Sequence, residues 1–511
     1  MNHVNKKNMM MIIFTSISIL VFLVLSAFAY SGGVRGSDQY RYISDTESLI
    51  KGESYSNIIF PAVFKNGVVK SMPRPFVHNV PVVYVAAFIG MFTVPYAGWA
   101  VLNILLTLST AFLIFLILKK RISIEISVLF SLLYIALPMV FWSGTQVLSE
   151  SFIAFFTTLG IYLFLNYKEN LLNWYFMMII SIVLLYCRTN FIIAVFMIPV
   201  LYLFVMRKKA KISIIVMNMV VMFIIAVFAL KFKKVIFPSY STGSSLIHTI
   251  FYNALPGKSN MANFNSLYLP QISINTMLQN ITLKLIQAIK IQFSFNLKTA
   301  LMYLPFNIMA LGSVAGLLIS GKKSSKIMLT GVFFLLYHMA TVVLFQNQTR
   351  YGMMAISGIF VAFAVFVCTN QKIHISNRVI AIILIVALPV CFASDFILAR
   401  QSRNEGIVSA KSGEVLKDAF RYIPDHENIS IYSDDLCYLE AYVARPRMVL
   451  LVGSNYSESE YEYMFGNSDI QWLIADNMLD LGKLPEFHLS NVYTYSKEGK
   501  DYTVYKINHE T

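Results

Sequence analysis

Long apolar stretches recur along most of this 511-residue chain, and no other feature constrains its fold as strongly. A bilayer core about 30 Å thick takes about 20 helical residues to cross. Since 57% of the residues are hydrophobic and only 13% are charged, the chain also has too few polar residues to enclose an ordinary soluble core. We therefore predict an α-helical polytopic membrane protein.

The apolar pattern predicts about eleven transmembrane helices when it is measured against the length that a bilayer requires. The first, at about residues 9–30, follows Lys6 and Lys7 and has the features of an uncleaved signal anchor with a cytoplasmic N-terminus. An odd number of spans then places the C-terminus outside the cell. The other spans are expected at about residues 99–118, 122–141, 147–165, 171–186, 190–206, 212–230, 300–320, 327–345, 351–367 and 379–398.

The net charge of +15 comes largely from short lysine and arginine runs at the ends of these stretches, such as Lys119-Lys120-Arg121. Such runs indicate membrane topology and contact with anionic lipid headgroups. No basic face with interleaved aromatic residues occurs in a polar segment, so nucleic acid is not an expected partner.

Polar segments divide the chain into a transmembrane module, residues 1–398, and a small C-terminal extracytoplasmic α/β domain, residues 399–511. The module has outer loops at 31–97 and 237–298, and the first loop has the aromatic and proline content of a folded loop with a site in it. Within it, residues 80–94 are expected to form an interfacial or re-entrant helix. In the C-terminal domain, the patterns predict a helix at 413–423 and strands at 429–432, 447–452, 471–476, 492–496 and 502–507.

Two carboxylates are placed where they could do chemistry. Asp38 stands in the first outer loop, where it could act as a general base, or could be a solvated loop residue paired with Arg35 or Arg41. Glu150 opens the expected fourth span, where it could act in a site or simply complement the dipole of its helix.

The surroundings of Asp38 resemble the first-loop signature of C-type (GT-C) membrane glycosyltransferases. Asp38 is followed by Tyr42, then by Arg74-Pro75, and then by a Pro81-x-x-Tyr84 helix start. The resemblance is strongest to the branch with the aminoarabinose transferase of lipid A and the protein O-mannosyltransferases. It implies that Asp38 is the catalytic acidic residue and that Arg74 occupies the place of a family lysine.

Further residues match motif positions of this family, and they occur in the same order along the chain. Glu150 matches the acidic residue at the start of the fourth span, and Arg188 matches a basic residue at a hairpin tip. Arg350 and Tyr351 match the Arg-Tyr pair that faces the donor phosphate. On the same resemblance, Arg74, Arg188, Arg350 and Tyr351 bind the donor phosphate, with Tyr42 and His78 in supporting positions. The residues alone leave other roles open, since Arg188 could snorkel to the interface and Arg350 could anchor a helix.

The sequence contains no metal motif. It also contains no glycine-rich nucleotide loop, and that absence argues against an enzyme that uses a cytoplasmic nucleotide sugar. The four cysteines indicate no disulfide framework. No cofactor is required by this interpretation, although Asp38 and Glu150 could hold a divalent metal as an alternative.

The expected function is therefore transfer of a sugar from a polyprenyl-phosphate donor to a glycan, lipid or protein acceptor of the cell envelope. Inversion at the sugar carbon and a location on the outer membrane face are part of this expectation. A polysaccharide polymerase or ligase, a flippase or transporter of lipid-linked sugars, and a non-catalytic assembly subunit are the alternatives. The concentration of polar residues in outer loops favours chemistry at the outer face over transport through the bilayer centre.

Overall fold

The computed structural model describes residues 3–52, 56–63, 69–74, 80–165, 171–187, 297–319, 325–344, 352–369, 375–424, 429–432, 449–452, 471–476, 488–497 and 500–508, with a few isolated positions between 220 and 290 and at 427.

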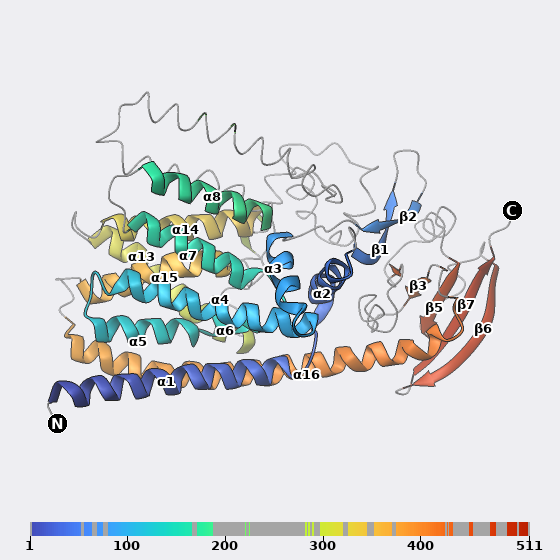
Figure 1. Cartoon of the computed structure of the whole chain (residues 1–511), viewed down its shortest axis with the longest axis horizontal. Coiled ribbons are helices and arrows are strands. Elements are labelled where there is room, and N and C mark those ends of the chain that lie inside the picture. The colour runs from blue at the N-terminus through green and yellow to red at the C-terminus, as the bar shows by residue number, and fades with distance from the viewer. Residues whose placement is uncertain are drawn as a thin grey trace.

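Most of the described helices lie side by side in one bundle, and a β-sheet lies beyond one end of it (Figure 1). The apolar length of these stretches explains the bundle, because a helix satisfies its own backbone hydrogen bonds where water is absent. The bundle helices are α1 (His3–Tyr30), α4 (Pro95–Leu118), α5 (Ile124–Ile135), α6 (Pro138–Gly144), α7 (Glu150–Leu165), α8 (Leu171–Cys187), α13 (Leu297–Ile319), α14 (Ser325–Leu344), α15 (Met353–Thr369) and α16 (Asn377–Phe420).

Four helices of the described part are long and apolar enough to cross a membrane: Asn8–Tyr30, Pro95–Leu118, Ala300–Ile319 and Asn377–Val408. Helices α5 and α6 form a fifth if they are one broken span, since they meet at 56° where Pro138 interrupts the backbone hydrogen bonding. The expected spans at 190–206 and 212–230 lie outside the described residues. The chain is thus a multi-pass membrane protein, and the number eleven stays a prediction.

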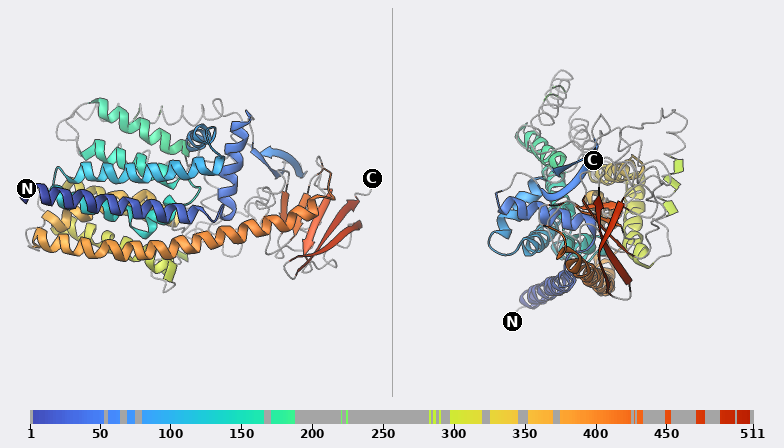
Figure 2. Two further views of the ribbon diagram at one scale, coloured as in Figure 1. Left: turned by 60° about the horizontal axis from the view of Figure 1, so that its bottom comes forward. Right: turned by 90° about the vertical axis from the view of Figure 1, so that its right-hand side faces the viewer.

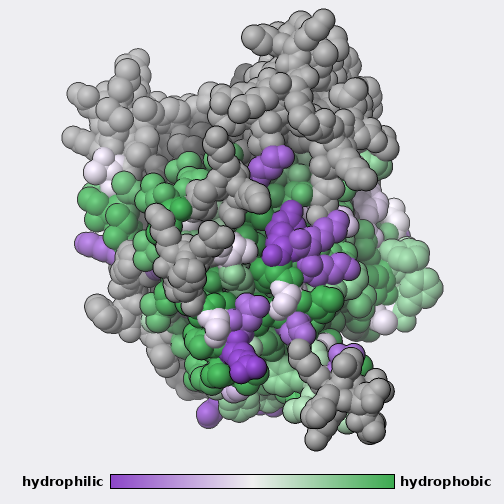
Figure 3. Space-filling model, turned by 90° about the vertical axis from the view of Figure 1, so that its left-hand side faces the viewer, coloured by the Kyte–Doolittle hydropathy of each residue, from purple (hydrophilic) through white to green (hydrophobic). Residues whose placement is uncertain are grey.

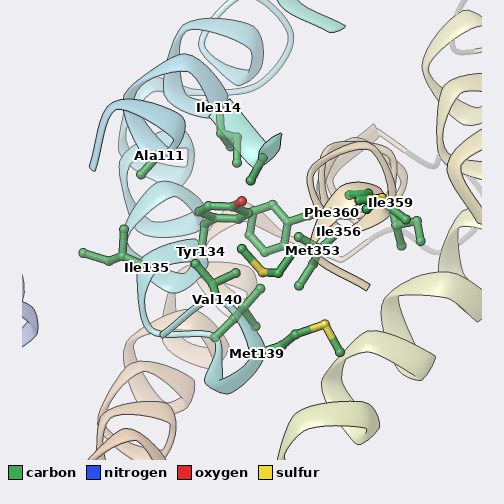
Figure 4. Close-up of a cluster of buried hydrophobic side chains, with 14 of the residues drawn as sticks. Ala111, Ile114, Tyr134, Ile135, Met139, Val140, Met353, Ile356, Ile359 and Phe360 are labelled. Atoms are coloured by element: carbon green, nitrogen blue, oxygen red, sulfur yellow. The ribbon is translucent and has the colours of Figure 1, made fainter. Parts of the chain in front are cut away.

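The centre of the bundle is packed by side chains of α5, α6 and α15 (Figure 4). The rings of Tyr134 and Phe360 meet edge to face with centroids 5.5 Å apart, and the Tyr134 hydroxyl lies 3.0 Å from the hydroxyl of Ser357. Gly358 allows α14 to pack closely, because a Cβ at this position would lie 2.3 Å from the ring of Phe334. These contacts hold α5, α14 and α15 together.

The two ends of the bundle differ chemically. At the basic end, α4 is followed by Lys119, Lys120 and Arg121. Figure 3 views the bundle from the side on which α1 and α16 begin, and hydrophilic residues gather there in patches among hydrophobic ones. Arg121 donates to the carbonyl oxygens of Ile117 at 2.6 Å and Leu165 at 3.0 Å, and so caps the last turns of α4 and α7. We call the opposite end, where α1 finishes and α4 and α7 begin, the loop end.

The expected first loop, residues 31–97, is built largely of regular elements at the loop end. It contains α2 (Gly36–Ile50), an antiparallel hairpin of β1 (Ser56–Val63) and β2 (Val69–Arg74), and α3 (Val80–Gly90). Helix α2 stands at a steep angle to the bundle helices at this end (Figure 2, left), and α3 is likewise steeply inclined to them (Figure 1). Helix α3 lies over the start of α4. It packs closely on α4 because Gly98 is a glycine: a Cβ at this position would lie 2.8 Å from the Gly90 nitrogen. Its other side exposes apolar rings, including Phe88, which is 64% exposed.

Helix α16 differs most from expectation. The sequence predicts a span that ends at residue 398 and a separate helix at 413–423, whereas the structure has one helix from Asn377 to Phe420. The expected domain boundary at 398 therefore falls inside a helix. Gly406 does not break it, and a Cβ there would lie 2.4 Å from the Gly32 carbonyl oxygen. Arg403 continues this contact by donating to the Ser31 hydroxyl at 3.2 Å.

The C-terminal part of the chain forms a five-stranded sheet with the order β4-β3-β5-β7-β6. The strands are β3 (Ile429–Tyr432), β4 (Val449–Val452), β5 (Trp472–Asp476), β6 (His488–Lys497) and β7 (Lys500–Asn508), which confirms the five expected strands. The first three pair in parallel, and β5, β7 and β6 pair antiparallel. The end of α16 packs on one face through Ala419, Phe420 and Ile423.

Candidate active site at the loop end

The loop end contains a buried polar cluster built around residues 144–146, the last residue of α6 and the first two of its connection to α7. The Tyr30 hydroxyl, at the end of α1, lies 3.1 Å from the Gly144 carbonyl oxygen and 3.3 Å from that of Gln146. Asn103 belongs to α4, and its side-chain amide donates to the same Gln146 oxygen at 2.5 Å. Polar side chains of α1 and α4 thus hold the connection to α7 in place.

Arg35 extends this cluster toward α2. It precedes the first residue of α2, is 5% exposed, and donates from Nη2 to the Thr145 carbonyl oxygen. Its Nε and Nη1 atoms are buried and have no hydrogen-bond partner among the described residues. Burial lowers the pKa of Arg35 from its ordinary value, and the nearby Tyr96, Tyr30 and Glu405 act in the opposite direction. A buried guanidinium with two unused donor atoms is well suited to an anionic group.

Helix α2 is fixed over the cluster by aromatic contacts with α4. The ring of Tyr42 lies 5.2 Å from that of Trp99, and the Trp99 indole N–H donates to the Thr46 hydroxyl at 2.8 Å. Both Tyr42 and Asp45 are buried in this packing. Asp38 lies in the first turns of α2, although its side chain is outside the described part of the structure.

Glu150 is the first residue of α7 and is fully buried. The neighbouring Ser149 and Ser151 are also buried, and the Ser151 hydroxyl lies 3.4 Å from that of Thr107. A carboxylate at this position is favoured by the positive end of the helix dipole. Glu150 opens a helix, as the sequence predicts. It lies in a polar, protein-enclosed setting at the loop end and directly follows the connection that Arg35 holds.

The other sequence candidates are not brought together by the described structure. Arg74 is the last residue of β2, opposite Ser56, and its side chain is outside the described part. His78, Arg188, Arg350 and Tyr351 lie outside the described residues, so their roles stay predictions. Where the chain is described, no group of three or more His, Cys, Asp or Glu side chains is placed to hold a metal ion.

Three buried charged residues of the described part, Arg35, Asp45 and Asp395, are not predicted as site residues from the sequence. From the sequence, Arg35 is expected only as a possible partner of Asp38. Asp395 lies within α16, is fully buried, and neither carboxylate oxygen has a hydrogen-bond partner in the described structure. An acidic residue inside an apolar span, as in CFASDFIL, is itself a signal of function that the sequence offered.

Comparison with known proteins identifies the fold. Residues 79–238 match the family model for dolichyl-phosphate-mannose-protein mannosyltransferase. The apo oligosaccharyltransferase of Archaeoglobus fulgidus is similar with a TM-score of 0.53 at 12% identity, over 90% of this chain and 69% of that one. ArnT from Cupriavidus metallidurans, bound to undecaprenyl phosphate, is similar with a TM-score of 0.46 at 11% identity, over 96% and 98%. No curated protein sequence gives a match. The chain is thus a multi-pass membrane protein with the GT-C fold of membrane glycosyltransferases.

Proposed function

We propose that the protein is an inverting glycosyltransferase that takes a sugar from a polyprenyl-phosphate donor. The match of residues 79–238 to a mannosyltransferase family that is named for such a donor, within a chain of GT-C fold, is the observation that carries this proposal. The buried polar cluster at the loop end supports it, because it supplies charged groups beside α2, the helix that carries Asp38.

In the proposed reaction, Asp38 removes the proton from an acceptor hydroxyl or amine, and the acceptor atom attacks the anomeric carbon of the donor sugar. A new bond to the acceptor forms as the bond from the anomeric carbon to the phosphate oxygen breaks, and the configuration inverts. The phosphate leaves as an anion, so it needs positive charge and no general acid. Arg74, Arg188 and Arg350, with Tyr351, are the proposed phosphate ligands.

The proposed orientation places the loop end outside the cell and the basic end in the cytoplasm. Lys119, Lys120 and Arg121 at the basic end support it, because lysine and arginine are retained on the cytoplasmic side. The acceptor is then a glycan, lipid or protein of the cell envelope.

Mass spectrometry of surface glycans and lipid-linked sugars tests the proposal. It compares cells that carry the wild-type protein, a deletion, or Asp38→Asn expressed at the same level. We expect both altered strains to lose one sugar from an envelope acceptor and to accumulate its polyprenyl-phosphate donor. A deletion that changes no glycan contradicts the proposed function. Normal glycans with Asp38→Asn alone contradict the role of Asp38.

A further inference from the structure

Four tyrosine rings form a continuous stack where α16 meets the C-terminal sheet. The ring of Tyr422, just after the end of α16, stacks on that of Tyr493 in β6 with centroids 3.9 Å apart and planes 25° apart. Tyr493 stacks in turn on Tyr495 at 5.7 Å, and Tyr495 on Tyr502 of β7 at 5.5 Å. Because every ring is held nearly parallel to the next, the orientation of the outermost ring is fixed.

A β-bulge in β6 creates this stack. Asn491 is paired with Tyr505, but Tyr493 is paired with Val504, so one extra residue is inserted at Val492. Since paired residues point to the same face of a sheet, the insertion moves Tyr493 and Tyr495 to the face that α16 covers. In a regular strand the two tyrosines would lie on the opposite face, away from Tyr422.

Only the outer part of the stack is accessible. Tyr502 and Tyr495 are 4% and 9% exposed, whereas Tyr422 is 44% exposed. Next to this open ring, Arg421 forms an ion pair with Asp418 at 3.8 Å. The Arg421 side chain is 78% exposed and that of Asp418 is 35% exposed, so the ion pair is weak and the Arg421 guanidinium can also bond to a ligand. Asp418, Arg421 and Tyr422 lie three and four residues apart, the spacing that brings side chains together on a helix.

We propose that Tyr422, with Asp418 and Arg421, is a binding site for a saccharide. A pyranose ring has an apolar face of C–H groups that packs on an aromatic ring, and hydroxyls at its edge that bond to a carboxylate and a guanidinium. The site offers one fixed ring with a donor and an acceptor beside it. One ring with a carboxylate and a guanidinium beside it supplies the contacts that a single sugar unit needs.

The ligand is then the acceptor glycan. One of its sugar units binds at Tyr422 beside the sheet while another part of the glycan reaches the loop end. This identity of the ligand depends on the proposed function, but saccharide binding itself does not. It can be measured in full-length protein that carries Asp38→Asn, in which the proposed transfer is blocked.

Ligand-observed NMR by saturation transfer tests the site, with maltotetraose, cellotetraose and chitotetraose as probes and the full-length protein in detergent micelles. We expect at least one probe to bind, with the strongest transfer to protons on one face of a sugar ring. Tyr422→Ala should weaken binding roughly tenfold, the effect of losing about 1.4 kcal/mol of ring contact. Tyr422→Phe should retain binding because it keeps the ring. Tyr505→Ala is the matched control, since it removes a ring from the opposite face of the same sheet.

Two results would overturn the site: absence of binding by all three probes to the protein, or equal binding by the wild type and Tyr422→Ala. Arg421→Ala gives a second test that leaves the stack intact, and it should weaken binding by a smaller factor. Failure of the proposed function has a different signature, because envelope glycans would then be unchanged in the deletion strain while the probes still bound at Tyr422.

Discussion

Replacing Arg35 by methionine should make the protein more stable and less active. Methionine keeps most of the length of the side chain and removes a charge that is 5% exposed and makes one side-chain hydrogen bond, to Thr145. Burial of an ion costs several kcal/mol, while a hydrogen bond from a charged group returns only about 1.5–3 kcal/mol. The difference favours methionine by about 1–3 kcal/mol.

The expected rise in the midpoint of thermal unfolding follows from the length of the chain. Unfolding entropies of about 2.1 cal/mol/K per residue, applied to 511 residues, give about 1 °C per kcal/mol. Arg35→Met should therefore raise the midpoint by about 1–3 °C, measured on purified protein in detergent. Transfer of sugar should fall at the same time, because the unused Nε and Nη1 donors are the reason to retain a charge here.

Arg121→Met is the matched control at the basic end. Arg121 donates from both of its Nη atoms, to Ile117 and Leu165, and so caps two helices. Its replacement should lower the midpoint and leave the loop end unchanged. If Arg35→Met also lowered the midpoint, the bond to Thr145 would outweigh the burial of charge, and Arg35 would be a structural residue. If it raised the midpoint without loss of transfer, the functional reason for Arg35 would be wrong.

Three further outcomes are expected. Glu150→Gln should reduce transfer at least tenfold with little change in the unfolding midpoint, because the amide keeps the shape of the buried carboxylate; normal glycans in such cells would exclude Glu150 from the site. Gly406→Val should separate α16 from the turn at Gly32, since even a Cβ would lie 2.4 Å from the Gly32 oxygen, and faster proteolysis near residue 406 would show it, whereas an unchanged digestion pattern would contradict the contact. Asp395→Leu should raise the unfolding midpoint by removing a buried carboxylate that has no hydrogen-bond partner in the described structure, and a lower midpoint would show that the carboxylate stabilises the fold.

Local pattern was enough to predict most of the helices and strands. Apolar stretches of bilayer length must be helical, since only a helix satisfies their backbone groups in lipid, and α1, α4, α13 and α15 lie close to the expected ranges. The short helix expected at 80–94, which the structure has at Val80–Gly90, and the strands of the C-terminal sheet also follow from local patterns. Glu150 could be placed at a helix start because its position depends only on where an apolar run begins.

Tertiary structure decided the features that depend on contacts between distant residues. Nothing near Arg35 in the sequence shows that its guanidinium is buried against Thr145 with two unused nitrogen atoms, because that environment comes from α1, α4 and the start of α7. Likewise, α16 continues through Gly406 where this glycine lies against the backbone of Gly32, a contact that the sequence does not show. The bulge at Val492 is the clearest case: a shift of one residue in pairing reverses the face of every side chain that follows, and only the pairing with β7 shows that Tyr493 and Tyr495 lie beside Tyr422.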